Sequence, residues 1–186
     1  MKTIENFMHK ITLRTVVISI IVFLAAFMLI NGSLIGTAKL MQVTGGVGNL
    51  DVEFGYTVDE AYDLFERLGP EGRSFNLRYI IPMDILFPLT LAFFFVCIIA
   101  YLLERINSST RRCTLFILPV AGVFFDWIEN ICITIMLLHY PDRLPIVCKL
   151  GSMATMLKFF IVIVNILLIT VLLAVLVIRV IRRKCV

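Results

Sequence analysis

The chain has 186 residues, of which 60% are hydrophobic and 16% are charged, and its formal net charge is +4. A composition this apolar excludes the soluble globular class and predicts an integral membrane protein. The excess of lysine and arginine needs no nucleic acid partner, because basic residues at the cytoplasmic ends of membrane helices account for it. We therefore expect a multi-pass protein of the cell (plasma) membrane that binds no nucleic acid.

Four apolar runs are each long enough to cross about 30 Å of hydrocarbon as a helix. They span residues 14–36, 79–103, 113–138 and 154–180. The first run follows a basic start, and its length favours a retained signal anchor over a cleaved signal. The connectors leave no room for a soluble domain. The sequence therefore predicts an all-α membrane protein, in which residues 1–186 form a single domain built on a four-transmembrane-helix bundle.

The orientation of the bundle follows from basic residues in the short loops. Such residues follow the second and fourth runs: Arg105, Arg111, Arg112, Arg179, Arg182, Arg183 and Lys184. We expect both of these segments, with the N-terminus, to face the cytoplasm. Residues 44–77 and the connector 139–153 are then expected outside.

An amphipathic helix is predicted within the outer segment. Residues 44–49, TGGVGN, are typical of a flexible stretch. Thr57 and Glu60 then form a capping-box pattern, and Gly69-Pro70 is a stop signal. Apolar residues recur at helical spacing between them: Ala61, Leu64, Phe65 and Leu68. This face is expected to pack over the outer ends of the bundle, with the lipid interface as the alternative.

The third run carries polar side chains that are costly in hydrocarbon. Asp126, Glu129 and Asn130 stand at i, i+3 and i+4, so they share one helix face with Gly122. A small residue on that face allows another helix to approach closely. We therefore expect these side chains to point into the bundle.

The second and fourth runs place further polar residues at matching depths. Counted at 1.5 Å per residue from the outer ends, Asp84 and Lys158 lie about 10 Å deep and Asn165 about 20 Å. Arg73 and Arg78 precede the second run, and snorkelling to lipid phosphates is the alternative to an inward position. The predicted ligand-binding residues are Asp84, Asp126, Glu129, Asn130, Lys158, Asn165, Arg78 and Arg73.

The charges of this group do not balance. Three carboxylates face Lys158 alone, or Lys158 and Arg78 if that arginine folds inward. Surplus carboxylates at low dielectric keep a proton or hold a cation. The five cysteines and two histidines form no CxxC or HExxH motif, so we predict no metal site and no cofactor.

The order and spacing of several short motifs resemble a group of small prokaryotic four-helix membrane proteins that has no settled activity. The motifs are FGYTVDEAYDLFERLGPEGR, D-x-x-F-P at 84–88, D-x-x-E-N at 126–130, L-L-x-Y-P at 137–141 and the lysine at 158. The resemblance covers roughly residues 55–165. It implies that these positions form one unit, and it supplies no reaction.

Three functions remain open from the sequence. The first is a small membrane protein with an acid-rich cavity in the outer half of the bilayer that binds a proton, a cation or the headgroup of a membrane lipid. The second is an intramembrane hydrolase that uses paired carboxylates such as Asp84 and Asp126, so an enzymatic activity stays undecided. The third is an accessory subunit that pairs with a membrane-protein partner or a second copy, through Gly32 and Gly36 of GSLIG. Alternatively, the polar residues only fix helix packing, for example through an ion pair between Asp84 and Lys158.

Overall fold

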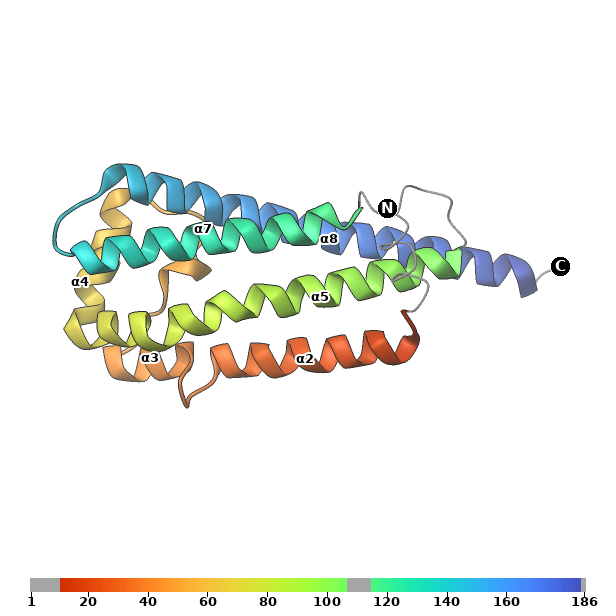
Figure 1. The fold of residues 1–186 in the computed structure, drawn as a ribbon, viewed down its shortest axis with the longest axis horizontal. Coiled ribbons are helices and arrows are strands. Elements are labelled where there is room, and N and C mark those ends of the chain that lie inside the picture. Colours follow the sequence, from red (N-terminus) through yellow and green to blue (C-terminus); the bar gives the residue numbers. More distant parts are fainter. Residues whose placement is uncertain (1–10, 107–114, 185–186) are drawn as a thin grey trace.

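The computed structural model describes residues 11–106 and 115–184, and these residues are helical with short connections (Figure 1). Four helices are long and apolar enough to cross a membrane: Leu13–Asn31, Val58–Ile106, Ile117–His139 and Pro145–Arg182. Of the basic residues expected at the cytoplasmic side, Arg111 and Arg112 lie outside the described residues. An all-helical bundle with four candidate membrane helices is therefore confirmed for the described chain.

The first long helix, α2 (Leu13–Asn31), is shorter than predicted. It ends at Asn31 because the chain turns at Gly32, and a second helix, α3 (Thr37–Thr44), begins after Gly36. A Cβ at Gly36 would collide with the carbonyl oxygen of Ile30, so this tight turn requires glycine. The prediction of a glycine pair on a helix face at GSLIG is wrong, since both glycines flank a turn.

The amphipathic helix is present as α4 (Val58–Phe75), and Thr57 and Glu60 form the predicted capping box. Gly69 has a left-handed backbone (φ 65°) that interrupts the helix, as the stop signal predicted. Helix resumes at Pro70, however, and continues through a π-helical turn, η2 (Asn76–Ile80), into α5 (Ile81–Ile106). The amphipathic helix and the second membrane helix therefore form one continuous but kinked helical segment, with no loop between them.

The apolar face of α4 packs on the ends of α7 (Ile117–His139) and α8 (Pro145–Lys184) (Figure 1). Phe65 of α4 is fully buried in a cluster that includes Ile133, Met136 and Cys148. Burial of this face against the bundle confirms the first alternative in the sequence prediction. α4 therefore covers one end of the helices.

The connector before α8 is much shorter than the predicted 139–153, because helix begins at Pro145. Proline suits the first helical position, where no backbone N–H is needed. The Tyr62 hydroxyl of α4 donates to the Asp142 carbonyl (3.0 Å) and accepts from the Leu144 amide (2.8 Å). These hydrogen bonds hold the short connector, just before the start of α8, against α4.

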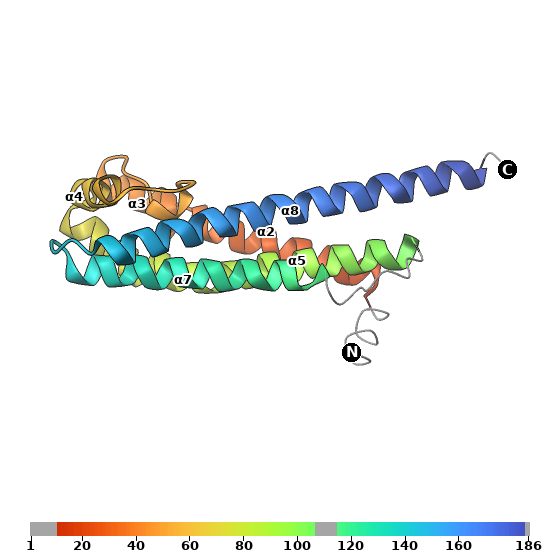
Figure 2. The same cartoon turned by 90° about the horizontal axis from the view of Figure 1, so that it is seen from above.

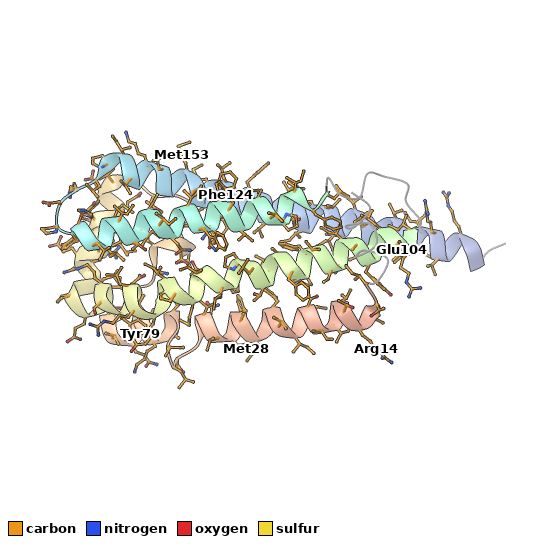
Figure 3. All side chains as sticks on the ribbon, in the orientation of Figure 1. Arg14, Met28, Tyr79, Glu104, Phe124 and Met153 are labelled. Atoms are coloured by element: carbon orange, nitrogen blue, oxygen red, sulfur yellow. The ribbon has the colours of Figure 1, made fainter. Side chains whose placement is uncertain are left out.

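The long helices pack in the order α2, α5, then the pair α7 and α8 (Figure 1), and the C-terminal part of α8 extends beyond the other helices (Figure 2). Phe23 of α2 packs on Phe87 and Phe94 of α5, with ring centroids 5.8 and 5.6 Å apart. Gly122 of α7 lets α8 approach closely, since a Cβ there would lie 3.3 Å from Ile161. The outer faces are apolar and exposed, as at Met28, Phe124 and Met153 (Figure 3).

Candidate functional site

The polar face of α7 points into the bundle as its spacing predicts. Asp126, Glu129 and Asn130 are all buried, and Glu129 is fully inaccessible. They lie opposite α8, which presents Thr155 and Lys158 one turn apart, both buried. The three polar side chains of α7 therefore face the two polar side chains of α8.

Lys158 forms ion pairs with two carboxylates of α7. Its Nζ lies 2.5 Å from Glu129 Oε2 and 3.2 Å from Asp126 Oδ1. Thr155 Oγ1 donates to the other oxygen of Glu129 at 2.6 Å. Glu129 therefore accepts a hydrogen bond at one oxygen and is ion-paired at the other. The pair between Asp84 and Lys158, considered from the sequence, does not form.

Asp84 enters the group through Asn130. The Asn130 amide nitrogen donates to Asp84 Oδ2 and to Asp126 Oδ2, each at 3.0 Å. A second link between α5 and α7 comes from Trp127, whose indole N–H donates to the Ile85 carbonyl at 3.0 Å. One amide group thus joins the carboxylates of two helices.

A fourth carboxyl group, from Asp51, reaches the same place, which the sequence analysis missed. It lies on η1 (Leu50–Val52), a 3₁₀ turn that folds against α7 instead of staying in a flexible outer loop. Asn49 and Leu50 anchor this turn, because both are buried and the Asn49 side chain accepts a 2.6 Å bond from Asn76. No periodic pattern marks Asp51 in the sequence, so only the tertiary contact reveals it.

The Asp51 and Asp84 carboxyl groups line the same cavity and are close enough for the charge of one to affect the other. The Oδ1 atom of Asp51 is buried without a hydrogen-bond partner, although the residue as a whole is half-buried. Burial raises the pKa of Asp51 well above its ordinary value; Asp84 and Glu129 raise it further, whereas Lys158 opposes the shift. Two carboxyl groups so close together favour a shared proton or a bound cation.

Tyr56 is a second residue at the site that the sequence analysis did not single out. Its side chain is buried near Gly151 of α8 and the Glu129 carboxylate. Burial and then the Glu129 charge raise the pKa of Tyr56, so its hydroxyl keeps its proton. Tyr56 therefore supplies a neutral donor at the outer edge of the acidic group.

A cavity of about 560 Å³ lies beside the acidic group and extends along the bundle. Its polar end is lined by Asp51, Asp84, Asp126 and Lys158, and Asn165 lines the cavity further along α8. Its remaining wall is mostly apolar and is rich in phenylalanine from α2, α5 and α8: Phe23, Phe27, Phe87, Phe94, Phe95 and Phe159. The cavity is therefore amphipathic, with acid at one end and aromatic rings along its length.

Asn165 lines the cavity but does not join the charged group. Its amide nitrogen donates to the Ile161 carbonyl of its own helix at 2.8 Å. Its oxygen is buried without a hydrogen-bond partner, and the residue is fully inaccessible to bulk solvent. A buried acceptor of this kind is costly unless something donates to it.

The two arginines lie away from this group. The Arg73 guanidinium donates to the Phe65 carbonyl at 2.7 Å and covers the Tyr140 ring, 4.1 Å from its centroid. Arg78 is exposed, so it does not fold inward to balance the carboxylates. Within the described ranges, the carboxyl groups of Asp51, Asp84, Asp126 and Glu129 therefore face Lys158 as the cation at the site.

The cavity can accept a cation or a hydrogen-bond donor, because the unpartnered atoms of its lining, Asp51 Oδ1 and Asn165 Oδ1, are acceptors. In the described parts of the chain, no three His, Cys, Asp or Glu side chains converge as metal ligands. Comparison with family models, curated proteins and solved structures finds no match. The resemblance to small four-helix prokaryotic proteins stays a prediction.

Proposed function

We propose that this chain is a small integral membrane protein that binds a membrane lipid or another membrane amphiphile in the cavity between its helices. The polar head of the ligand contacts the acidic end, and its apolar part lies along the phenylalanine wall. The observation that carries this proposal is the amphipathic cavity of about 560 Å³. Its volume is in the range of known ligand pockets. A bare proton or metal ion would leave the apolar part without a purpose.

The edge of the cavity supports entry from lipid. Three apolar residues line the cavity and are still about half exposed: Phe27 of α2 (47%), Val52 of η1 (59%) and Ile166 of α8 (51%). In a bilayer, exposed apolar surface on long apolar helices faces hydrocarbon. We infer a lateral opening between α2 and α8, because α2 packs mainly on α5. A ligand dissolved in the membrane would enter without crossing water.

We propose that the end covered by α4 faces outside the cell membrane. Arg14 lies at the opposite end of the bundle, near Glu104 (Figure 3). Arg105 and Arg179 lie at the ends of α5 and α8 there, which the positive-inside rule assigns to the cytoplasm. The acidic end of the cavity would then lie in the outer half of the bilayer.

The hydrolase hypothesis has less support from the geometry. In that hypothesis Asp84 and Asp126 share a proton and activate water. The Asn130 amide instead donates to one oxygen of each carboxylate, and Lys158 takes the other oxygen of Asp126. The partner-subunit hypothesis relied on Gly32 and Gly36 lying on one helix face. Both glycines flank a turn instead, so they form no helix-packing motif.

The test compares a cavity-filling variant with a matched surface variant by native mass spectrometry after gentle extraction. Ala92→Phe adds a ring inside the cavity, whereas Ala25→Phe adds the same ring on the exposed face of α2. We expect wild type and Ala25→Phe to retain one amphiphile per chain and Ala92→Phe to lose it. If wild type retains none, and added membrane lipid extract stabilises Ala92→Phe as much as wild type, the proposal is wrong.

A further inference from the structure

The acidic end of the cavity has two parts with different hydrogen-bonding states. In the first part, Lys158 and Thr155 occupy the oxygens of Glu129, and Lys158 also binds Asp126. This part is complete without a ligand. Since Lys158 is held by two carboxylates, its charge is not free to attract an anion.

The second part consists of Asp51 and Asp84, which line the cavity. Among the residues that the structure describes, the cation near them is Lys158, which is already ion-paired. Asp51 Oδ1 is buried without a partner, and the Asn130 amide reaches one Asp84 oxygen. This part carries a surplus of negative charge and of acceptors.

Asn165 gives an independent indication of the same chemistry. It lies seven residues beyond Lys158 on α8, about 10 Å further along the cavity. Its buried oxygen also lacks a partner. The unsatisfied polar atoms along the cavity wall, Asp51 Oδ1 and Asn165 Oδ1, are therefore both acceptors. A donor at the acidic end would complement Asp51 Oδ1, whereas Asn165 Oδ1, deeper in the cavity, would need a second donor. A carboxylate or phosphate at the acidic end would be repelled.

Resting on the proposed function, we propose that the ligand is a long-chain amine without a phosphate group, and that Asp51 and Asp84 bind its ammonium head. An ammonium group has three donors and a positive charge, so it matches a pair of carboxyl groups that share one site. A phospholipid headgroup fits less well, because its phosphate would need a free cation that the described part of the site does not offer. The apolar chain follows the phenylalanine wall away from the acids.

The test measures binding of octadecylamine and of octadecanol to the full-length protein in lipid nanodiscs by native mass spectrometry. The two probes have the same chain and differ only in the head. Wild type is expected to bind the amine at least about tenfold more tightly than the alcohol, as hydrogen bonds to charged groups allow. Equal affinities would overturn the amine assignment and leave the amphiphile cavity standing. If neither probe binds and wild type carries no co-purifying amphiphile, both proposals fail.

The variant Asp51→Asn keeps the size of the side chain and removes its charge, and Glu53→Gln makes the matched change at an exposed position two residues away. Asp51→Asn should lose the preference for the amine and keep its affinity for the alcohol, which also shows that it is folded. Glu53→Gln should behave as wild type. A preference for the amine that survives Asp51→Asn would refute the role of Asp51.

Discussion

Removal of the Lys158 ammonium group is the strongest perturbation of the buried site. Lys158→Met keeps the apolar stem and leaves Glu129 and Asp126 without their cation, 2.5 and 3.2 Å from where the ammonium stood. Breaking a buried ion pair by removing one partner costs about 3–5 kcal/mol, because the remaining charge is uncompensated. We therefore expect the free energy of unfolding of Lys158→Met to fall by about that amount.

Arg143→Met is the matched control. The Arg143–Asp59 pair has a similar separation, 2.6 Å, but its side chains are 54% and 83% exposed. Exposed pairs contribute about 0–1 kcal/mol, and the distant Tyr62 ring, 5.7 Å away, adds about 1 kcal/mol at most. Equilibrium unfolding in mixed detergent micelles compares the two variants. Equal losses would refute the argument that burial, not distance, sets the strength of the Lys158 pairs.

The expected effect of Glu129→Gln on the free energy of unfolding has opposite signs in the wild-type chain and in Lys158→Met. Glu129→Gln in the wild-type chain removes the closest partner of Lys158 and should destabilise it. Added to Lys158→Met, the same substitution removes an unpaired buried charge and should recover part of the lost stability. Two losses that simply add would mean that Lys158 and Glu129 do not interact in solution.

Three smaller perturbations test other contacts. Gly36→Ala should lower the free energy of unfolding by about 1–3 kcal/mol, because its Cβ collides with a backbone carbonyl of the preceding helix; an unchanged value would contradict the turn. Tyr62→Phe should cost about 1–2 kcal/mol in the same assay, since the Leu144 amide loses its acceptor; no loss would mean that water replaces the hydroxyl. Burial raises the pKa of Asp51 above its ordinary 3.8, so the unfolded chain releases this proton first as pH rises. The stability of ligand-free protein should therefore fall as pH increases above 3.8 and level off once the folded pKa is passed. A comparison of thermal unfolding against pH should show a shallower fall in Asp51→Asn than in Glu53→Gln, and parallel curves would refute the assignment.

The sequence predicted those parts of the site that lie on regular helices. Asp126, Glu129 and Asn130 share a face because helical periodicity fixes their directions. Asp84 and Lys158 could be matched to them by depth, because the rise per residue is constant. Which carboxylate pairs with Lys158 depends on helix rotation and lateral packing. Spacing within one helix does not contain that information.

The parts that the sequence did not predict depend on contacts between segments far apart in the chain. Asp51 reaches the site because the Asn49 side chain accepts a hydrogen bond from Asn76, 27 residues later. Arg73 turns away because the Tyr140 ring and a backbone carbonyl offer it a closer position. Neither contact has a local pattern, so the sequence analysis included Arg73 among the predicted binding residues and left Asp51 out.

The two parts of the acidic end also separate a packing role from the proposed binding role. Lys158, Glu129 and Thr155 join α7 to α8 through an ion pair and a hydrogen bond, which is what helix packing requires. Packing gives no reason for Asp51, which comes from a 3₁₀ turn outside the long helices and adds negative charge beside Asp84. A chain selected only for a stable bundle would gain by replacing Asp51 with an apolar residue, since a buried acceptor without a partner costs free energy. Its position at the end of an amphipathic cavity is therefore better explained by a ligand that donates to it.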